Sequence, residues 1–228
     1  MEAYMNEILK DGWSVDGCIN IGKLLQYTTR ITQYDAMKRE WPHLRELHLL
    51  GTSDYRPRDK RLETGCYVNR EESWLLIIGV EPAVVNRIVS RYGAGLEVLD
   101  IRFTDLEDFP GECCPNLREL KLRENKQLNW EWYRMPLPKL EKLEADIPGG
   151  RILDVGHLGN LREMILRGKS NPNAVVEGVS RLQHLKKLHL AFVSLGDALE
   201  LDGMTPFLVP LLLLMQKFFH YERQISDV

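Results

Sequence analysis

The stretch CPNLRELKLREN, from Cys114 to Asn125, decides the fold. Its leucines are Leu117, Leu120 and Leu122, which are spaced by three residues and then by two. An amphipathic helix would space its apolar residues by three and four, and a half-buried strand would space them by two throughout. The pattern L-x-x-L-x-L instead predicts a turn that leads into a short strand, in which the last two leucines point to the same side.

The same pattern recurs along most of the chain at a nearly constant interval. Its clearest copies are HLRELHL, GLEVLDI, NLRELKL, KLEKLEA, NLREMIL and HLKKLHL, and a weaker copy comprises Leu75, Ile78 and Val80. From position 75 onward, the first apolar positions follow at steps of 21 to 24 residues. This pattern and this period are those of leucine-rich repeat proteins, which the chain therefore resembles from about Trp41 to Leu213.

The resemblance implies an α/β fold, namely a leucine-rich repeat solenoid or horseshoe. Parallel strands would line its concave face, and the convex side would be irregular or built from short helices. Because each coil buries its leucines only against neighbouring coils, each coil should begin one strand beyond the last. Two back segments support this arrangement. Val80 to Gly93 carries apolar residues at helical spacing, and Asn171 to Gln183 begins with a plausible helix cap.

The domain organisation follows from the extent of the repeats. We predict an N-terminal helical cap over residues 1–40, because a terminal coil exposes apolar surface that needs a cover. Residues 41–228 would form an array of seven or eight coils, with an inserted loop near residues 51–72. The apolar segment Pro206 to Phe219 is shorter than the roughly 20 residues that cross a bilayer, so we predict a buried last repeat. A membrane anchor is the alternative for that segment.

Composition and motifs limit the classes of function. The net charge of −3 argues against a dedicated nucleic-acid binder, which is usually basic. The chain contains no phosphate-binding loop, zinc-protease motif or serine-hydrolase motif. We therefore expect no catalytic residues, no metal site and no cofactor. The four cysteines lack C-x-x-C spacing, and we expect reduced thiols in a cytoplasmic or nuclear protein.

The outward positions of the strands would form continuous rows, because neighbouring strands lie about 4.8 Å apart. One row contains three arginines, which are enriched at binding hot spots and can pair with carboxylates through two hydrogen bonds. Two histidines share another outward row, and we expect both to face solvent. From these rows we predict that a protein partner binds the concave face through His48, Arg102, Lys121, Arg123, Glu144, Asp146, Arg167 and His189.

A narrower resemblance concerns LLQYTTRITQYDAMKREWPHLRELHLLGTS, residues 24–53. This segment is similar to the one that leads into the repeats of fungal F-box/leucine-rich repeat proteins. That family implies substrate recognition by the repeats, and binding of the Skp1 adaptor of a cullin ubiquitin ligase by the F-box. The F-box itself is not visible in this sequence, so no ligase-binding residues are carried over.

A second resemblance leaves an alternative open. The repeat LQHLKKLHL, residues 182–190, is also similar to the sensor regions of plant nucleotide-binding immune receptors. Both resemblances imply a non-catalytic array that recognises another protein. The alternatives from other classes are an enzyme and a scaffold that is attached to a membrane through residues 206–219.

Overall fold

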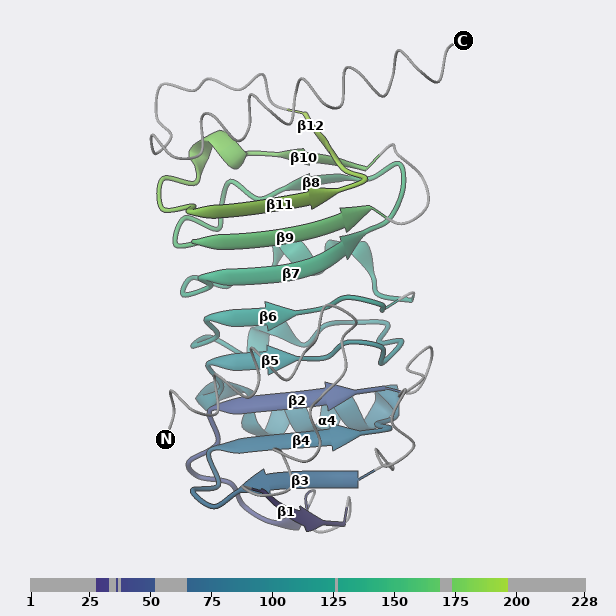
Figure 1. Cartoon of the computed structure of the whole chain (residues 1–228), viewed down its shortest axis with the longest axis vertical. Coiled ribbons are helices and arrows are strands. Elements are labelled where there is room, and N and C mark those ends of the chain that lie inside the picture. Colours follow the sequence, from purple (N-terminus) through teal and green to yellow (C-terminus); the bar gives the residue numbers. More distant parts are fainter. Residues whose placement is uncertain are drawn as a thin grey trace. The chain divides into compact units, whose positions relative to one another are not determined.

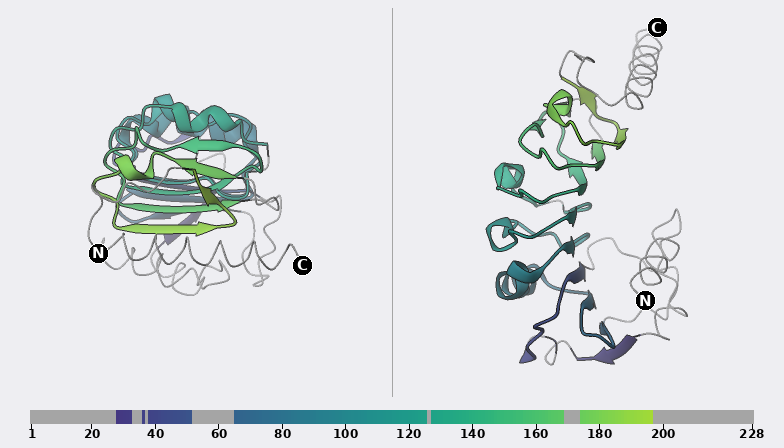
Figure 2. Two further views of the ribbon diagram at one scale, coloured as in Figure 1. Left: turned by 90° about the horizontal axis from the view of Figure 1, so that it is seen from above. Right: turned by 90° about the vertical axis from the view of Figure 1, so that its left-hand side faces the viewer.

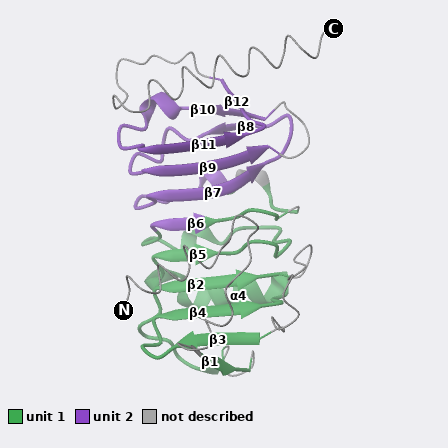
Figure 3. Cartoon of the chain, viewed as in Figure 1, with its two compact units in different colours: residues 1–117, 121–132 green, residues 118–120, 133–228 purple. Residues whose placement is uncertain are grey.

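The computed structural model describes residues 28–32, 36, 38–51, 65–125, 127–168 and 174–196. The chain divides into two compact units, which Figure 3 distinguishes by colour. Unit 1 comprises Met1–Leu117 and Lys121–Trp132, and unit 2 comprises Arg118–Leu120 and Tyr133–Val228. Within each unit the described strands are mostly parallel and belong to stacked coils with little helix, which confirms the coarse prediction of a solenoid.

Unit 1 is a mixed sheet with one α-helix behind it. Its strand order is β1-β3-β4-β2-β5, as Figure 1 shows. β4, β2 and β5 are parallel, whereas β3 pairs antiparallel with both β1 and β4. The strands are β1 (Thr28–Ile31), β2 (Glu46–Leu50), β3 (Gly65–Asn69), β4 (Trp74–Ile78), β5 (Val98–Asp100) and β6 (Glu119–Lys121), of which β6 has residues in both units.

Two of these strands lie in ranges for which we expected other structure. β1 falls within the range predicted as a helical cap, and β3 falls within the range predicted as an inserted loop. The sequence GCYVN of β3 is short, and its last four residues are all buried, so that it lacks the alternation that marks a half-buried strand. Most other residues of 1–40, and residues 52–64, lie outside the described ranges.

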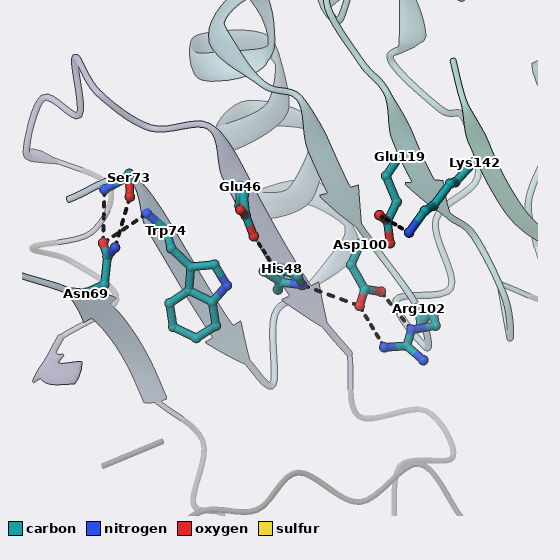
Figure 4. A network of polar contacts seen from close by, with 9 residues as sticks. All are labelled: Glu46, His48, Asn69, Ser73, Trp74, Asp100, Arg102, Glu119 and Lys142. Atoms are coloured by element: carbon teal, nitrogen blue, oxygen red, sulfur yellow. Dashed lines mark hydrogen bonds and ion pairs between the residues drawn. The ribbon is translucent and has the colours of Figure 1, made fainter. Parts of the chain in front are cut away.

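The hairpin between β3 and β4 is held by the side chain of Asn69. Its Oδ1 accepts hydrogen bonds from the backbone nitrogens of Ser73 (2.9 Å) and Trp74 (3.0 Å). Its Nδ2 donates to Ser73 Oγ at 2.9 Å, and Figure 4 shows this turn. These bonds stabilise a tight turn in which Glu72 has a φ of 56°, in the left-handed region that non-glycine residues rarely adopt.

This hairpin changes the order of the coils relative to the sequence. β4 pairs with one edge of β2 through Leu47↔Leu75, and β5 pairs with the opposite edge of β2. The expectation that each coil lies one strand beyond the last is therefore wrong at this place. The register predicted for the weak repeat is also wrong, because Ile77 and not Ile78 takes the second inward position of β4. The physical reason for the changed strand order is that β4 is hydrogen-bonded to β3 on one edge, so that only its other edge can pair with β2.

The helix α4 (Pro82–Tyr92) carries the chain from β4 back to β5 and confirms the first predicted back segment. Apart from the helical positions Ala36 and Lys38, it is the only α-helix among the residues that the structure describes. Proline suits its first turn, where a backbone N–H would have no partner within the helix. Val85, Ile88 and Val89 are buried and form one apolar stripe. Figures 1 and 2 place the helix behind β2 and β4.

Asn125 satisfies the backbone of two successive turns in unit 1. Its Nδ2 donates to the carbonyl oxygens of Ile101 (2.6 Å) and Leu122 (2.9 Å). Its Oδ1 accepts hydrogen bonds from the backbone nitrogen of Leu106 (3.2 Å) and from Thr104 Oγ1 (2.7 Å). Because the residue is buried, no water competes for these groups, and the side chain supplies bonds that the turns would otherwise lack.

We expect Asn125→Ala to lower the free energy of unfolding by about 2–4 kcal/mol, because several buried backbone groups lose their partner. Asn116→Ala is the matched control, since Asn116 Nδ2 donates to one carbonyl, that of Ala94, at an exposed site (2.8 Å). That variant should lose at most about 1 kcal/mol. Urea unfolding followed by circular dichroism measures both losses, and equal losses would contradict the role assigned to the buried network.

Unit 2 contains two parallel sheets. The first has the order β7-β9-β11 and the second has the order β12-β10-β8. Figure 2 shows the second sheet on the back of the coils, opposite the first sheet. The strands are β7 (Lys142–Ile147), β8 (Ile152–Asp154), β9 (Glu163–Gly168), β10 (Val175–Glu177), β11 (Lys187–Ala191) and β12 (Ser194–Leu195).

The second predicted back segment does not form an α-helix over its described residues. Val175–Glu177 is the strand β10, and Val179–Arg181 is a single 3-10 turn. The adjacent valines favour an extended backbone because their branched side chains restrict rotation in a helix. β10 obtains backbone partners on both sides, from β8 and β12, and Gly178 then turns the chain with a φ of 77°.

Glycines permit a close backbone approach at the end of two strands. A Cβ added to Gly168, the last residue of β9, would lie 2.0 Å from the carbonyl oxygen of Phe192. In unit 1, a Cβ added to Gly51 after β2 would lie 1.8 Å from the carbonyl oxygen of Phe103. Real Cβ atoms do not tolerate such distances. The two turns can therefore stack this closely only because a glycine lies against the carbonyl oxygen of the next turn.

Gly168→Ala should lower the free energy of unfolding by about 2–3 kcal/mol, because the backbone of two turns must separate to admit the methyl group. Gly159→Ala is the control within the same unit, since no atom lies within 4 Å of its added Cβ. The control should change stability by less than about 0.5 kcal/mol. Denaturant unfolding of both proteins measures the difference, and a tolerant Gly168→Ala variant would show that these turns are looser than the structure indicates.

The apolar segment from Pro206 to Phe219 lies outside the described residues, and so does the first position of the predicted last repeat, Leu208. In the ranges that the structure covers, no helix combines the length and the apolar character that a membrane span requires.

Candidate functional site

The eight residues predicted to contact a partner are divided between the two units. Within each unit the structure brings its members onto neighbouring strands, so that each group forms a site of its own. Unit 1 holds His48 on β2, Arg102 just after β5, and Lys121 and Arg123 at β6. Unit 2 holds Glu144 and Asp146 on β7, Arg167 on β9 and His189 on β11.

His48 belongs to a cluster of charged side chains in unit 1, which Figure 4 shows. Arg102 donates two hydrogen bonds to Asp100, from Nε to Oδ1 (2.8 Å) and from Nη2 to Oδ2 (2.7 Å). His48 Nδ1 lies 3.5 Å from Asp100 Oδ2, and His48 Nε2 lies 3.8 Å from Glu46 Oε2. The imidazole also packs on Trp74, with ring centroids 5.4 Å apart. The ring therefore lies between two carboxylates and an indole.

The expectation that His48 faces solvent is wrong. His48 is 3% exposed, Asp100 is fully buried, and Arg102 is 8% exposed. The paired outward positions on β4 are apolar, because Leu76 lies opposite His48 and Ile78 lies at the next outward position, and both are buried. The rule of alternating burial assumes that the outer side of a strand meets water. The apolar outward residues of β4 were the signal in the sequence that this rule would fail here.

Opposing effects set the protonation states in this cluster. Burial disfavours the charged imidazolium, but the nearby carboxylates of Asp100 and Glu46 outweigh it and raise the pKa of His48 above its ordinary value of 6.5. Burial also disfavours the carboxylate of Asp100, but the charge of Arg102 and the bonds from His48 and Arg102 hold the pKa of that carboxyl far below its usual range. The charge of Lys121 opposes protonation of His48 and favours the Asp100 carboxylate.

The arrangement suits a structural charge network more than a reaction centre. The polar neighbours of the His48 ring among the described residues are two carboxylates, and activation of a nucleophile would need a hydroxyl or thiol against the ring. A buried Asp–Arg pair with two parallel hydrogen bonds has a fixed geometry, and it loses stability when one partner is removed. The guanidinium of Arg102 is therefore bound to the carboxylate of Asp100 within unit 1, and its burial makes it a poor contact for a partner.

The raised pKa of His48 predicts the pH dependence of stability. The folded state favours the charged imidazolium, so its contribution is complete below the unfolded pKa of about 6.5 and is lost as the pH rises through the higher folded pKa. Asp100 acts in the opposite direction, because its depressed pKa contributes stability above about pH 4 that is lost in acid. We expect the free energy of unfolding to fall as the pH rises above about 6.5, and His48→Gln to reduce this fall.

Urea unfolding at a series of pH values measures the effect. His189→Gln is the control, because it removes a histidine from the same register position on an exposed strand of unit 2. If His48→Gln keeps the full pH dependence of the native chain, the charge network assigned to His48 is wrong.

The outward face of β7, β9 and β11 in unit 2 confirms the rows that the repeat register predicts. Glu144 pairs with Ile165, Asp146 pairs with Arg167, and Ile165 pairs in turn with His189. The alternate positions of all three strands are buried. The outward side chains are exposed or half-buried, so this face is available to another molecule.

The outward row at the beginning of these strands contains Lys142, Glu163 and Lys187, and its charges are partly neutralised by ion pairs. Lys142 Nζ lies 3.3 Å from Glu119 Oε2, and Lys187 Nζ lies 3.4 Å from Glu163 Oε2. In the next two rows of outward residues Arg167 and His189 are exposed, as Lys187 is in this row.

Phe192 was missed by the analysis of the sequence. It directly follows β11 and is 73% exposed, with a φ of 57°. The corresponding position is Gly168 at the end of β9 and Phe103 after β5, so the repeat itself does not mark Phe192. The available signal is a large aromatic residue directly after a strand, because exposed aromatic area is costly in water.

The described residues contain no group of three or more histidine, cysteine or acidic side chains that could hold a metal ion. Comparison of the chain with protein-family models, with curated proteins and with solved structures gives no match. Inference about function therefore depends on the geometry and chemistry of the strands.

Proposed function

We propose that this chain is a non-catalytic protein-recognition module of the leucine-rich repeat type, and that a protein partner binds the outward face of β7, β9 and β11. We define the unit 2 face as Ile165, Arg167 and His189, and we add Phe192, which directly follows β11 and is exposed, as a further contact candidate. The observation that carries the proposal is the exposure of Arg167 and His189 on a face whose alternate residues are buried in a parallel sheet.

The composition of the unit 2 face supports this role. Arginine and aromatic residues dominate the binding energy of protein interfaces, because they combine a large contact area with directed hydrogen bonds. Phe192 offers an exposed aromatic ring after β11, and Arg167 offers a guanidinium on the adjacent strand β9. The side chains project from regular strands, so little conformational entropy is lost in ordering their backbone when a partner binds.

The buried cluster in unit 1 has no contact role in this proposal. His48 and Arg102 are committed to Asp100 and are nearly inaccessible. Lys121 at the end of β6 and Arg123, two residues beyond it, are half-buried and are second candidates for contact. The proposal therefore narrows the eight residues predicted from the sequence mainly to those in unit 2.

The resemblance of residues 24–53 to F-box/leucine-rich repeat proteins supports a more specific proposal. In that form the array is a horseshoe that selects substrates for a ubiquitin ligase in the cytoplasm or nucleus, and Skp1 and a cullin accompany it. The sensor array of a plant immune receptor is the alternative binding module, and it requires neither ligase protein. A membrane-attached scaffold is the alternative from another class, and it depends on residues 206–219.

We expect the double variant Arg167→Ala/Phe192→Ala to weaken binding of the partner at least tenfold, which corresponds to the loss of about 1.4 kcal/mol or more of hot-spot contact. The control is Arg151→Ala/Ile152→Ala, which removes an exposed arginine and an adjacent apolar residue that is 53% exposed. Quantitative affinity purification would identify proteins that are lost with the first variant and kept with the second. Titration of the purified partner then gives the change in affinity.

Equal capture of every protein by the native chain and both variants would contradict binding at the unit 2 face. Co-purification of Skp1 and a cullin would support the ligase form of the proposal, and a specific partner without them would support the sensor form. Both variants should retain the circular dichroism spectrum and unfolding midpoint of the native chain, so that a lost partner reflects a lost contact.

A further inference from the structure

A polar hollow of about 240 Å³ lies in unit 2, beside the leucines that enter the core just before the strands begin. These leucines, Leu140, Leu161 and Leu185, are fully buried. The residues on either side of a buried leucine project away from the core, so the coils place them in two adjacent rows. The row before the leucines consists of Lys139, Asn160 and His184. The row after them consists of Glu141 and Arg162, together with Arg118, which follows the equivalent Leu117.

Backbone hydrogen bonds hold the row that follows the leucines in register. Glu141 N donates to Arg118 O, and Arg162 N donates to Glu141 O, both at 2.8 Å. In the other row, Asn160 Nδ2 donates to the carbonyl oxygen of Pro138 at 2.6 Å and so fixes the side chain against the preceding coil. The hollow is therefore shaped by the repeat itself and does not depend on a single long loop.

The hollow carries an excess of positive charge. Glu141 Oε1 accepts a hydrogen bond from Arg118 Nη1 at 2.6 Å, and Glu141 Oε2 lies 3.5 Å from Arg162 Nε. One carboxylate thus lies between two guanidinium groups, while Lys139 adds a third cation to the lining. The side chains of Arg118 and Arg162 are 55% and 56% exposed, so an incoming ligand can reach both.

We propose that this hollow binds a phosphomonoester dianion. The lining holds three cationic side chains and one carboxylate, a formal balance of two positive charges, and a phosphomonoester carries about −1.5 to −2 charges at neutral pH. A guanidinium has five N–H donors in a planar fork that fits phosphate oxygens, and the ion pair of Arg162 with Glu141 is formed through its Nε. His184 lines the same space and offers ring nitrogens to a phosphate oxygen.

A neutral or singly charged ligand fits this lining less well. A single carboxylate would leave one positive charge uncompensated, and an apolar group would meet a lining of charged and amide side chains. The phosphate can be carried by a phosphorylated serine or threonine side chain, or it can be free inorganic phosphate. Both sources present the same terminal oxygens to the arginines, and they differ in whether neighbouring peptide atoms add contacts.

The test is a titration of the full-length, 15N-labelled chain at about pH 7.5, where a phosphomonoester is mainly dianionic. Three probes are added at matched ionic strength: a short phosphoserine peptide, the same peptide without phosphate, and inorganic phosphate. We expect the phosphoserine peptide to shift the amide resonances of residues 139–141, 160–162 and 184, and the unphosphorylated peptide to leave them unchanged. Equal affinity for inorganic phosphate would identify the free anion as the source, and weaker affinity would identify the peptide.

Two substitutions with opposite effects distinguish a built site from general attraction to a basic surface. Arg162→Gln removes one guanidinium and should weaken binding about three- to tenfold, an effect reduced by its exposure to solvent. Glu141→Gln removes the competing carboxylate and should strengthen binding severalfold. Arg151→Gln, an exposed arginine outside the hollow, should have no effect beyond a change of one unit in net charge.

Absence of shifts with both phosphate-bearing probes in the folded native chain would overturn the proposal. Equal weakening by Arg162→Gln and Arg151→Gln would also overturn it, because the attraction would then reflect net charge alone. Unfolding midpoints of the variants establish that they are folded. The hollow and the unit 2 face use different residues, so loss of phosphate binding would leave the proposed protein recognition unaffected, and the reverse also holds.

Discussion

Burial of leucine between neighbouring coils is the interaction on which the rest of the structure depends. A coil of this length encloses too little volume for a core of its own, so Leu161, Met164 and Leu166 of unit 2 gain their burial only when the coils of β7 and β11 stack on either side. Stacking at strand distance then dictates the turns. Gly51 and Gly168 allow carbonyl oxygens to approach to distances that no side chain would tolerate. Asn125 supplies the hydrogen bonds that the turn backbone cannot obtain from a ladder. The leucine repeat, the two glycines and Asn125 thus each allow the coils to stack at strand distance.

The repeat register could be predicted from the sequence because it is local and periodic. The outward rows of unit 2 pair as the leucine spacing requires, for example Asp146 with Arg167, and the first back helix appears where its valines indicated. The order of the strands in unit 1 could not be predicted in the same way. It depends on the antiparallel hairpin formed by β3 and β4, and the side chain of Asn69 that holds this hairpin gives no periodic signal. A short strand with both faces buried looks like any other apolar run.

The candidate site was harder to predict than the fold, because burial of a polar row is decided by tertiary packing. His48 and His189 occupy the same position in the repeat, and the pattern gives them the same expected environment. In the structure His48 is 3% exposed and is held by Asp100, whereas His189 is exposed on β11. The difference arises from their neighbours, since His48 lies beside Leu76 and Trp74 on β4. A register therefore predicts which residues share a row, and the chemistry of adjacent strands decides whether that row meets water.

Equivalent positions of the repeat can thus carry side chains of different charge without any change of the backbone. The positions that flank the first leucine of each coil are equivalent, yet in unit 2 they carry Arg118, Glu141 and Arg162 in succession. Alternating signs let Glu141 neutralise part of two guanidinium charges, and both arginine side chains are more than half exposed. The outward strand positions of the same coils carry Arg167 and His189 instead. Because the leucines fix the backbone, substitutions at either set of positions alter recognition at little expense to the core. A solenoid of this kind can therefore combine a face for a protein surface with an edge for an anion.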